Sequence, residues 1–157
     1  MKFSSNEDIE APIKDAFALF TDFDQFERSA LRRSADVRRI DTLGQNGVGM
    51  AWNTQFKLRG KERKIDAEMV EYCEPENFCL QLQSEEVTAL AHVELMPLSK
   101  GRTRASVSVE LKPISLAGRL LVQSLRLGKA RLDKKFKKKA GDFVRNLERD
   151  YQAKNKA

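Results

Sequence analysis

The spacing of hydrophobic and polar positions changes along the chain, and each spacing predicts a different kind of element. Residues 1–11 alternate loosely, which predicts a strand that ends before Pro12. In residues 12–34 the apolar positions recur at helical spacing, which predicts two short helices in tandem. Pro12 suits the first helical turn, and Asp22 or Asp24 is expected to cap the second helix.

The period falls to two residues in the segment 35–112, which predicts six antiparallel strands joined by short turns. The clearest strand is 48–58, where Trp52, Thr54 and Phe56 share one face and polar residues share the other. The later strands repeat this alternation. Because the connections are short, consecutive strands should be neighbours in one sheet that has a single apolar face.

The last segment, residues 114–153, contains no proline and predicts one long C-terminal helix. At helical spacing, one stripe carries Phe136, Phe143 and Leu147, and we expect this stripe to pack on the sheet. The opposite side passes from leucines in the first half to cations in the second. The residues that we assign to this outer face are Leu116, Leu120, Leu127, Lys134, Lys135 and Lys138.

Length and composition fit a single globular domain over residues 1–157. Apolar residues make up 41% of the chain and charged residues 33%, which is enough apolar surface to build one core. No apolar run reaches the roughly 18 residues that span a bilayer, and residues 1–10 do not form a secretory signal. We therefore expect a cytoplasmic protein. Cys73 and Cys79 lie on opposite parities around a predicted turn, which favours free thiols over a disulfide.

The positive charge of the chain is concentrated in one part of the predicted C-terminal helix. Residues 126–139 carry eight Lys or Arg and one Asp, a charge of +7, whereas the whole chain has a net charge of +6. The rest of the chain therefore sums to about zero. Such a run indicates either a solvated helix face or contact with an anionic surface. We rank nucleic acid below both, because only Phe136 interrupts the run and no stacking array or recognition motif accompanies it.

Few residues offer catalytic chemistry. His92 is the only histidine, and its parity with Glu94 predicts a side chain on the outer surface. Glu71 and Tyr72, at the end of a predicted strand, are the acid/base pair least at odds with a catalytic site. The Cys and His counts exclude the common structural zinc spacings, and the glycines in 44–49 precede a strand rather than a phosphate-binding helix. We assign no catalytic residue, cofactor or metal site.

The order of the predicted elements resembles that of the START-like (SRPBCC) superfamily, whose members have a helix-grip fold. The resemblance covers essentially the whole chain: strand, two short helices, six antiparallel strands and a long C-terminal helix. This superfamily includes plant pollen-allergen proteins, polyketide cyclases and dehydrases, and bacterial proteins of the coenzyme Q-binding type. The residues that carry the resemblance are Ala11-Pro12, the helix pair from Phe17 to Phe26, Gly47 to Trp52, Glu74-Pro75-Glu76 and Thr103-Arg104.

The resemblance implies an α+β fold in which a curved sheet wraps around the long helix and leaves a cavity for an apolar ligand. Inward strand residues, aromatic residues of the short helices and small residues of the long helix should form its wall. At any single position, a solid core is an equally good interpretation. The predicted cavity residues are Phe20, Phe23, Phe26, Trp52, Thr54, Phe56, Ile65, Met69, Leu80, Leu82, Val107, Val109, Ser124 and Gly128.

Three classes of function are compatible with these features. We predict non-catalytic binding or transport of a small hydrophobic ligand, such as a lipid, a quinone or a polyketide-like molecule. The leucine and lysine face would then dock on an anionic membrane, although the N-terminal helices or a second copy in a homodimer could instead cover the leucines. The alternatives are an enzyme of the polyketide cyclase/dehydrase type and an interaction module without a ligand.

Overall fold

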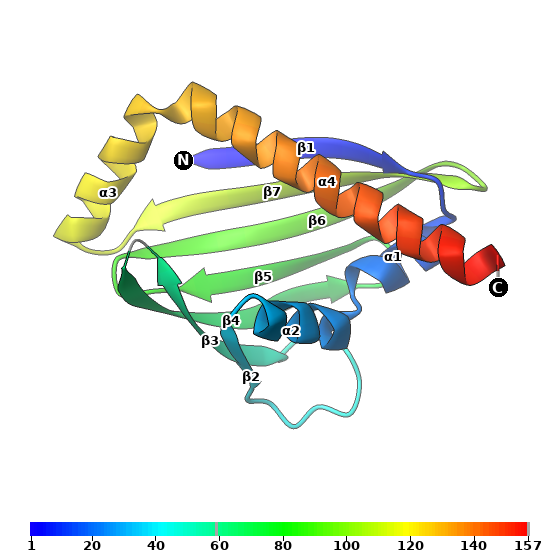
Figure 1. Cartoon of the computed structure of the whole chain (residues 1–157), viewed down its shortest axis with the longest axis horizontal. Helices are drawn as coiled ribbons and strands as arrows, with labels where there is room; N and C mark the ends of the chain where they lie inside the picture. Colours follow the sequence, from blue (N-terminus) through cyan, green and yellow to red (C-terminus); the bar gives the residue numbers. More distant parts are fainter. Residues whose placement is uncertain (59, 157) are drawn as a thin grey trace.

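An antiparallel sheet forms the frame of the molecule, and the computed structural model describes it within residues 1–58 and 60–156. In this part of the chain the sheet has seven strands in the order β1-β7-β6-β5-β4-β3-β2 (Figure 1). Every strand from β2 to β7 therefore pairs with its neighbour in sequence, which confirms the predicted meander. The strands are β1 (Lys2–Ile9), β2 (Asp36–Arg39), β3 (Ala51–Leu58), β4 (Lys61–Cys73), β5 (Asn77–Gln83), β6 (Val87–Ser99) and β7 (Arg102–Pro113).

Helices lie against one face of this sheet. The two predicted short helices are α1 (Ile13–Phe20) and α2 (Phe23–Arg32), and Asp22 caps α2 by accepting a hydrogen bond from the Gln25 backbone N–H (3.3 Å). The long helix α4 (Lys129–Lys156) crosses the sheet near the edge formed by β1 and β7. Helix α2 lies on the same face but near the other edge, beside β2 (Figure 1). This arrangement leaves the middle of the sheet face between two helices.

The C-terminal segment forms two helices, which corrects the prediction of one helix over residues 114–153. Helix α3 (Leu116–Leu127) ends at Gly128, whose backbone N–H donates to the carbonyl of Leu125 (3.1 Å), and α4 starts at the next residue in a different direction (Figure 1). A glycine costs about 1 kcal/mol relative to alanine inside a helix, so a break at this position is inexpensive. Periodicity alone continues across the break and does not reveal it.

The most deeply buried part of the core surrounds α1. Ile9 and Phe17 are fully buried, and Phe17 makes edge-on contacts with Tyr72 and Phe78 at ring-centroid distances of 5.4 Å and 6.1 Å. The buried hydroxyl of Thr103 donates to the carbonyl of Ala11 (2.8 Å), which ties β7 to the turn before α1. This region is filled by protein side chains, so open space between sheet and helices has to lie elsewhere.

Candidate ligand cavity

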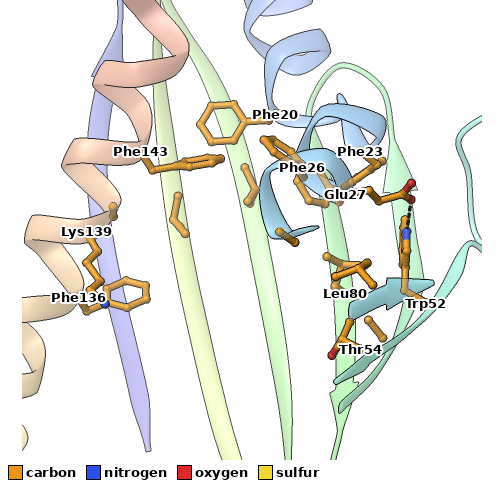
Figure 2. Close-up of a pocket in the computed structure, with 17 residues that line it drawn as sticks. Phe20, Phe23, Phe26, Glu27, Trp52, Thr54, Leu80, Phe136, Lys139 and Phe143 are labelled. Atoms are coloured by element: carbon orange, nitrogen blue, oxygen red, sulfur yellow. Dashed lines mark hydrogen bonds between the residues drawn. The ribbon is translucent and has the colours of Figure 1, made fainter. Parts of the chain in front are cut away.

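A cavity of about 620 Å³ lies between the sheet and the helices α2 and α4 (Figure 2). Binding sites for small molecules typically measure about 300–1,000 Å³, so its size suits such a ligand. Lys139 and Phe143 of α4 line the cavity and are exposed, which means that the cavity opens to solvent along this helix. Figure 2 shows Phe136, Lys139 and Phe143 on the α4 side, with Phe23, Phe26 and Glu27 on the α2 side.

Part of the predicted set of cavity residues lines this space. Strand pairing brings inward residues of different strands together, because Trp52 lies opposite Ala67 and both belong to the cavity wall. The aromatic residues of α1 and α2 close the wall from above the sheet. The predicted residues that line the cavity are Phe20, Phe23, Phe26, Trp52, Thr54, Leu80 and Val107.

The other predicted residues do not line it. Met69 is fully buried in the core, Ser124 is exposed on α3, and Gly128 marks the end of that helix. Ser124 and Gly128 lie away from the cavity because the chain changes direction at Gly128 instead of continuing as one helix over the sheet. The remaining residues of the set are half-buried strand residues outside the cavity wall, namely Phe56, Ile65, Leu82 and Val109.

Several lining residues were not in the predicted set. Phe136, Ala140 and Phe143 belong to the apolar stripe of α4, so the stripe that was expected to pack on the sheet partly faces open space. The strand positions Phe78 and Val93 have the inward parity, which was a usable signal. The other additional residues are Glu27, Ala30, Val37, Ala67 and Lys139. Of these, Glu27 and Lys139 are charged, so the pattern of apolar positions in the sequence could not indicate that they line a cavity.

Three of the 17 lining residues have polar or charged side chains besides the indole N–H of Trp52. The Glu27 carboxylate accepts a hydrogen bond from Trp52 Nε1 (2.7 Å), drawn as a dashed line in Figure 2. The Thr54 hydroxyl donates to the backbone carbonyl of Ile65 (2.8 Å). The third residue is Lys139. Apart from these groups, a ligand in the cavity meets aromatic and aliphatic surface.

An ion pair beside the cavity, formed by Arg39 and Asp41, contacts Trp52. The Arg39 guanidinium lies 5.2 Å from the centre of the Trp52 ring and also binds Asp41. The hydrogen bond from Arg39 lowers the pKa of Asp41 well below its usual range, and backbone N–H groups of Ala51 and Leu43 add to this effect. Asp41 therefore remains ionised and connects the start of β3 to the end of β2.

The predicted acid/base pair does not meet in the cavity. Tyr72 packs edge-on against Phe17 in the core, whereas Glu71, the preceding residue, lies on the other face of the sheet. On that face Glu71 Oε2 lies 3.8 Å from His92 Nε2, and Glu94 Oε1 lies 3.7 Å from His92 Nδ1. His92 therefore points away from the cavity, as its parity predicts.

Both cysteines are free thiols, as the sequence predicts. Cys79 is buried on the outer face, where it lies opposite Glu71 and His92 in the strand pairing. Burial raises the pKa of its thiol, and the charge of Glu71 adds to the shift, which makes Cys79 a poor nucleophile near neutral pH. Within residues 1–58 and 60–156, no group of three or more His, Cys, Asp or Glu side chains is placed to hold a metal ion.

Solved structures resemble this chain, whereas no protein-family model and no curated protein sequence matches it. The Zhui aromatase/cyclase from a Streptomyces species superimposes with a TM-score of 0.63 at 8% identity, over 95% of this chain and 94% of that one. A START superfamily protein from Mycobacterium smegmatis gives 0.56 at 10%, over 85% and 95%. An HSP90 activator from Plasmodium falciparum gives 0.51 at 20%, over 73% and 76%.

These similarities establish the fold of the chain as the START-like helix-grip fold, as the order of its predicted elements indicates. At such low identity they establish the fold alone, and proteins with different activities share it. Of the helices in the described ranges, none combines the length and the apolar composition needed to cross a lipid bilayer. What distinguishes this chain from other proteins of the same fold is therefore its own cavity and surface.

Proposed function

We propose that the protein binds a small hydrophobic ligand in the cavity between α2, α4 and the sheet. The observation that carries this proposal is the composition of the wall, in which aromatic and aliphatic side chains surround a space of about 620 Å³. Side chains that line a void lack partners for dispersion contacts on one side. An apolar ligand would supply these contacts and would remove the wall from water, which is the main driving force for such binding.

The polar groups of the wall favour binding over catalysis. A cyclase or dehydrase would need an acid and a base that converge on the reacting atoms. Here the Glu27 carboxylate is engaged by Trp52, the Thr54 hydroxyl is engaged by a backbone carbonyl, and Glu71 and Tyr72 lie outside the cavity. For this reason we propose a carrier or binding protein rather than an enzyme.

Filling the cavity tests this proposal. In an Ala140→Phe variant, a phenyl ring would occupy part of the cavity, whereas Ala130→Phe places the same ring on an exposed position of the same helix outside the cavity. Native mass spectrometry would detect a co-purified small molecule, and Trp52 fluorescence would report binding of added 1-decanol. We expect 1-decanol to bind the wild type and Ala130→Phe but not Ala140→Phe. Equal binding by both variants would place the site elsewhere, and no binding to the wild type would refute the proposal.

We further propose that the protein docks on anionic membranes through α3 and the basic beginning of α4. Helix α3 contacts the body of the protein with Gly118 and Val122, which are buried, and presents its opposite side to solvent. On that side Leu116, Leu120 and Leu127 are 74%, 61% and 92% exposed. Residues 1–58 and 60–156 thus leave these leucines uncovered, which argues against the alternative that the N-terminal helices cover them.

Cations follow the exposed leucines directly along the chain. Lys134, Lys135 and Lys138 are all exposed on α4, and they belong to the segment 126–139 that carries a charge of +7. Near an anionic leaflet each basic residue contributes about 1 kcal/mol, and leucines that enter the boundary of the acyl chains add a hydrophobic contribution. This combination supports an interfacial helix better than a solvated face, because leucine side chains gain free energy when they leave water for an apolar environment.

Co-sedimentation with liposomes tests membrane docking. We expect binding to vesicles that contain anionic lipid, weaker binding at higher salt, and little binding to neutral vesicles. Changing Lys134, Lys135 and Lys138 together to Glu should abolish the binding. A variant with three exposed lysines outside this surface changed to Glu, at positions 14, 100 and 154, has the same net charge and should still bind. Binding that ignores lipid charge, or a stable dimer that buries the leucines, would overturn the proposal.

A further inference from the structure

The two charged residues in the cavity wall differ in how well the protein compensates them. Glu27 on α2 is the acidic residue, and its carboxylate accepts a hydrogen bond from Trp52 Nε1 (2.7 Å). The guanidinium of Arg39 lies 5.2 Å from the centre of the Trp52 ring. It also interacts electrostatically with the Glu27 carboxylate. The negative charge of the wall is therefore satisfied by groups of the protein itself.

Lys139 on α4 lacks a comparable partner. Among residues 1–58 and 60–156, neither the ion pairs nor the side-chain hydrogen bonds to carboxylates include Lys139. The nearest acidic residues along α4 are engaged with other cations, because Asp133 pairs with Lys129 and Asp142 pairs with Arg145. The segment 134–139 contains five lysines and no acid. The segment of α4 that carries Lys139 is therefore strongly positive, and Lys139 is its one lysine that lines the described cavity.

The position of Lys139 on the helix places this charge at the mouth of the cavity. Phe136 precedes it by three residues and Phe143 follows it by four, so all three side chains share one face of α4. Figure 2 shows the Lys139 side chain beside the Phe136 ring on this wall. Lys139 is exposed, whereas the aromatic residues of α1 and α2 lie deeper. A ligand that reaches the apolar interior thus passes an ammonium group at the rim.

We infer that the ligand of this cavity is an amphiphile with an anionic head group, which Lys139 binds at the rim while the apolar body fills the aromatic interior. The inference rests on the proposed ligand binding and adds the chemical class and the orientation of the ligand. A charged head group would lose much of its hydration inside the apolar wall, so it stays at the solvent-exposed rim. There a carboxylate or phosphate accepts a charge-assisted hydrogen bond from the ammonium group and relieves the repulsion among the lysines.

A series of probes with equal chain length separates the charge from the chain. Decanoate, decyl phosphate, 1-decanol and decylammonium would be titrated at low salt, with binding followed by the fluorescence of Trp52, the single tryptophan. We expect the two anions to bind about fivefold more tightly than 1-decanol, which is the effect of one exposed ion pair, and decylammonium to bind more weakly than 1-decanol. Comparing carboxylate with phosphate distinguishes a fatty-acid-like ligand from a phospholipid-like one.

Two matched variants assign the preference to one residue. Lys139→Met removes the charge at the cavity and should bring the anions to the affinity of 1-decanol. Lys137→Met removes a neighbouring exposed charge on the same helix, which does not line the cavity, and should keep the preference. If the wild type binds 1-decanol and the anions equally, the anionic ligand is wrong while hydrophobic binding stands. If the preference survives in Lys139→Met, Lys139 is not the binding group, and if no probe binds, the proposed function itself fails.

Discussion

The position of α3 depends on a close approach that only glycine allows. A Cβ atom built on Gly118 would lie 1.8 Å from the carbonyl oxygen of Glu86, in the turn between β5 and β6. Real Cβ contacts stay above 3.0 Å, so in a Gly118→Ala variant the helix and the turn would have to separate by 1.2 Å, the difference between 3.0 and 1.8 Å. The same carbonyl accepts the backbone N–H of Ile114 (2.9 Å), and the separation would break or stretch this bond.

The size of the effect follows from opposing contributions. Overpacking of this kind costs about 1–3 kcal/mol, and loss of the hydrogen bond from Ile114 costs about 1 kcal/mol. The higher helix propensity of alanine returns about 1 kcal/mol. We therefore expect Gly118→Ala to weaken the docking of α3 by about 1–3 kcal/mol, while the rest of the fold stays intact because α3 contacts few other elements.

Hydrogen exchange measured element by element is the appropriate assay. A loss of 1–3 kcal/mol in docking should accelerate exchange of α3 amides about 5- to 150-fold and leave the amides of β6 and β7 beyond the turn unchanged. Gly128→Ala is the control, since its Cβ meets no atom within 4 Å, and it should leave α3 exchange unchanged or slower. Wild-type exchange of α3 in Gly118→Ala would refute the argument that this contact holds α3 on the sheet.

Three further predictions concern the core, the region beside the cavity and the thiols. Phe17→Ala removes a fully buried ring and should lower the free energy of unfolding by about 3–5 kcal/mol, measured by urea denaturation; a loss below about 1 kcal/mol would contradict its place in the core. Because the folded-state pKa of Asp41 is depressed by Arg39, its contribution to stability is present above the unfolded pKa of about 3.9 and is lost as pH falls below it. In Asp41→Asn, the free energy of unfolding should therefore fall less steeply than in the wild type as the pH is lowered below about 4. An equally steep fall in both proteins would refute this. With a thiol reagent at neutral pH, Cys73 should react rapidly and Cys79 slowly, so Cys73→Ala should lose the fast phase.

The proposals for ligand and membrane are connected by charge. Both proposals draw on lysines of the segment 134–139, since Lys139 lines the cavity while Lys134, Lys135 and Lys138 are exposed to solvent. An anionic membrane surface and an anionic head group are recognised by the same chemistry. The variants separate the two roles, because Lys139→Met should alter ligand preference with little effect on vesicle binding, and the triple Glu variant should do the reverse.

The order and type of the elements could be predicted because these signals are local. Alternation identifies which side of a strand is apolar, and short connections make consecutive strands neighbours, which is why the meander agrees with the observed sheet. Parity also found Trp52, Leu80 and Val107 in the wall. It failed for Phe56 and Val109, which have the same parity but lie outside the cavity, because parity gives the side of the sheet and not the position relative to α2 and α4.

The sequence by itself determined the helix-grip order, the outward position of His92, and the exposure of Leu116, Leu120 and Leu127 and of the lysines that follow them. Each of these depends on residues a few positions apart, whose relative orientation the backbone geometry of helices and strands sets directly. Only the tertiary structure decided that α3 leaves the line of α4, that the Glu27 carboxylate accepts the hydrogen bond of Trp52, and that Lys139 lines the cavity without an ion-pair partner in residues 1–58 and 60–156. These facts depend on how separate elements approach one another, which packing across the whole chain decides.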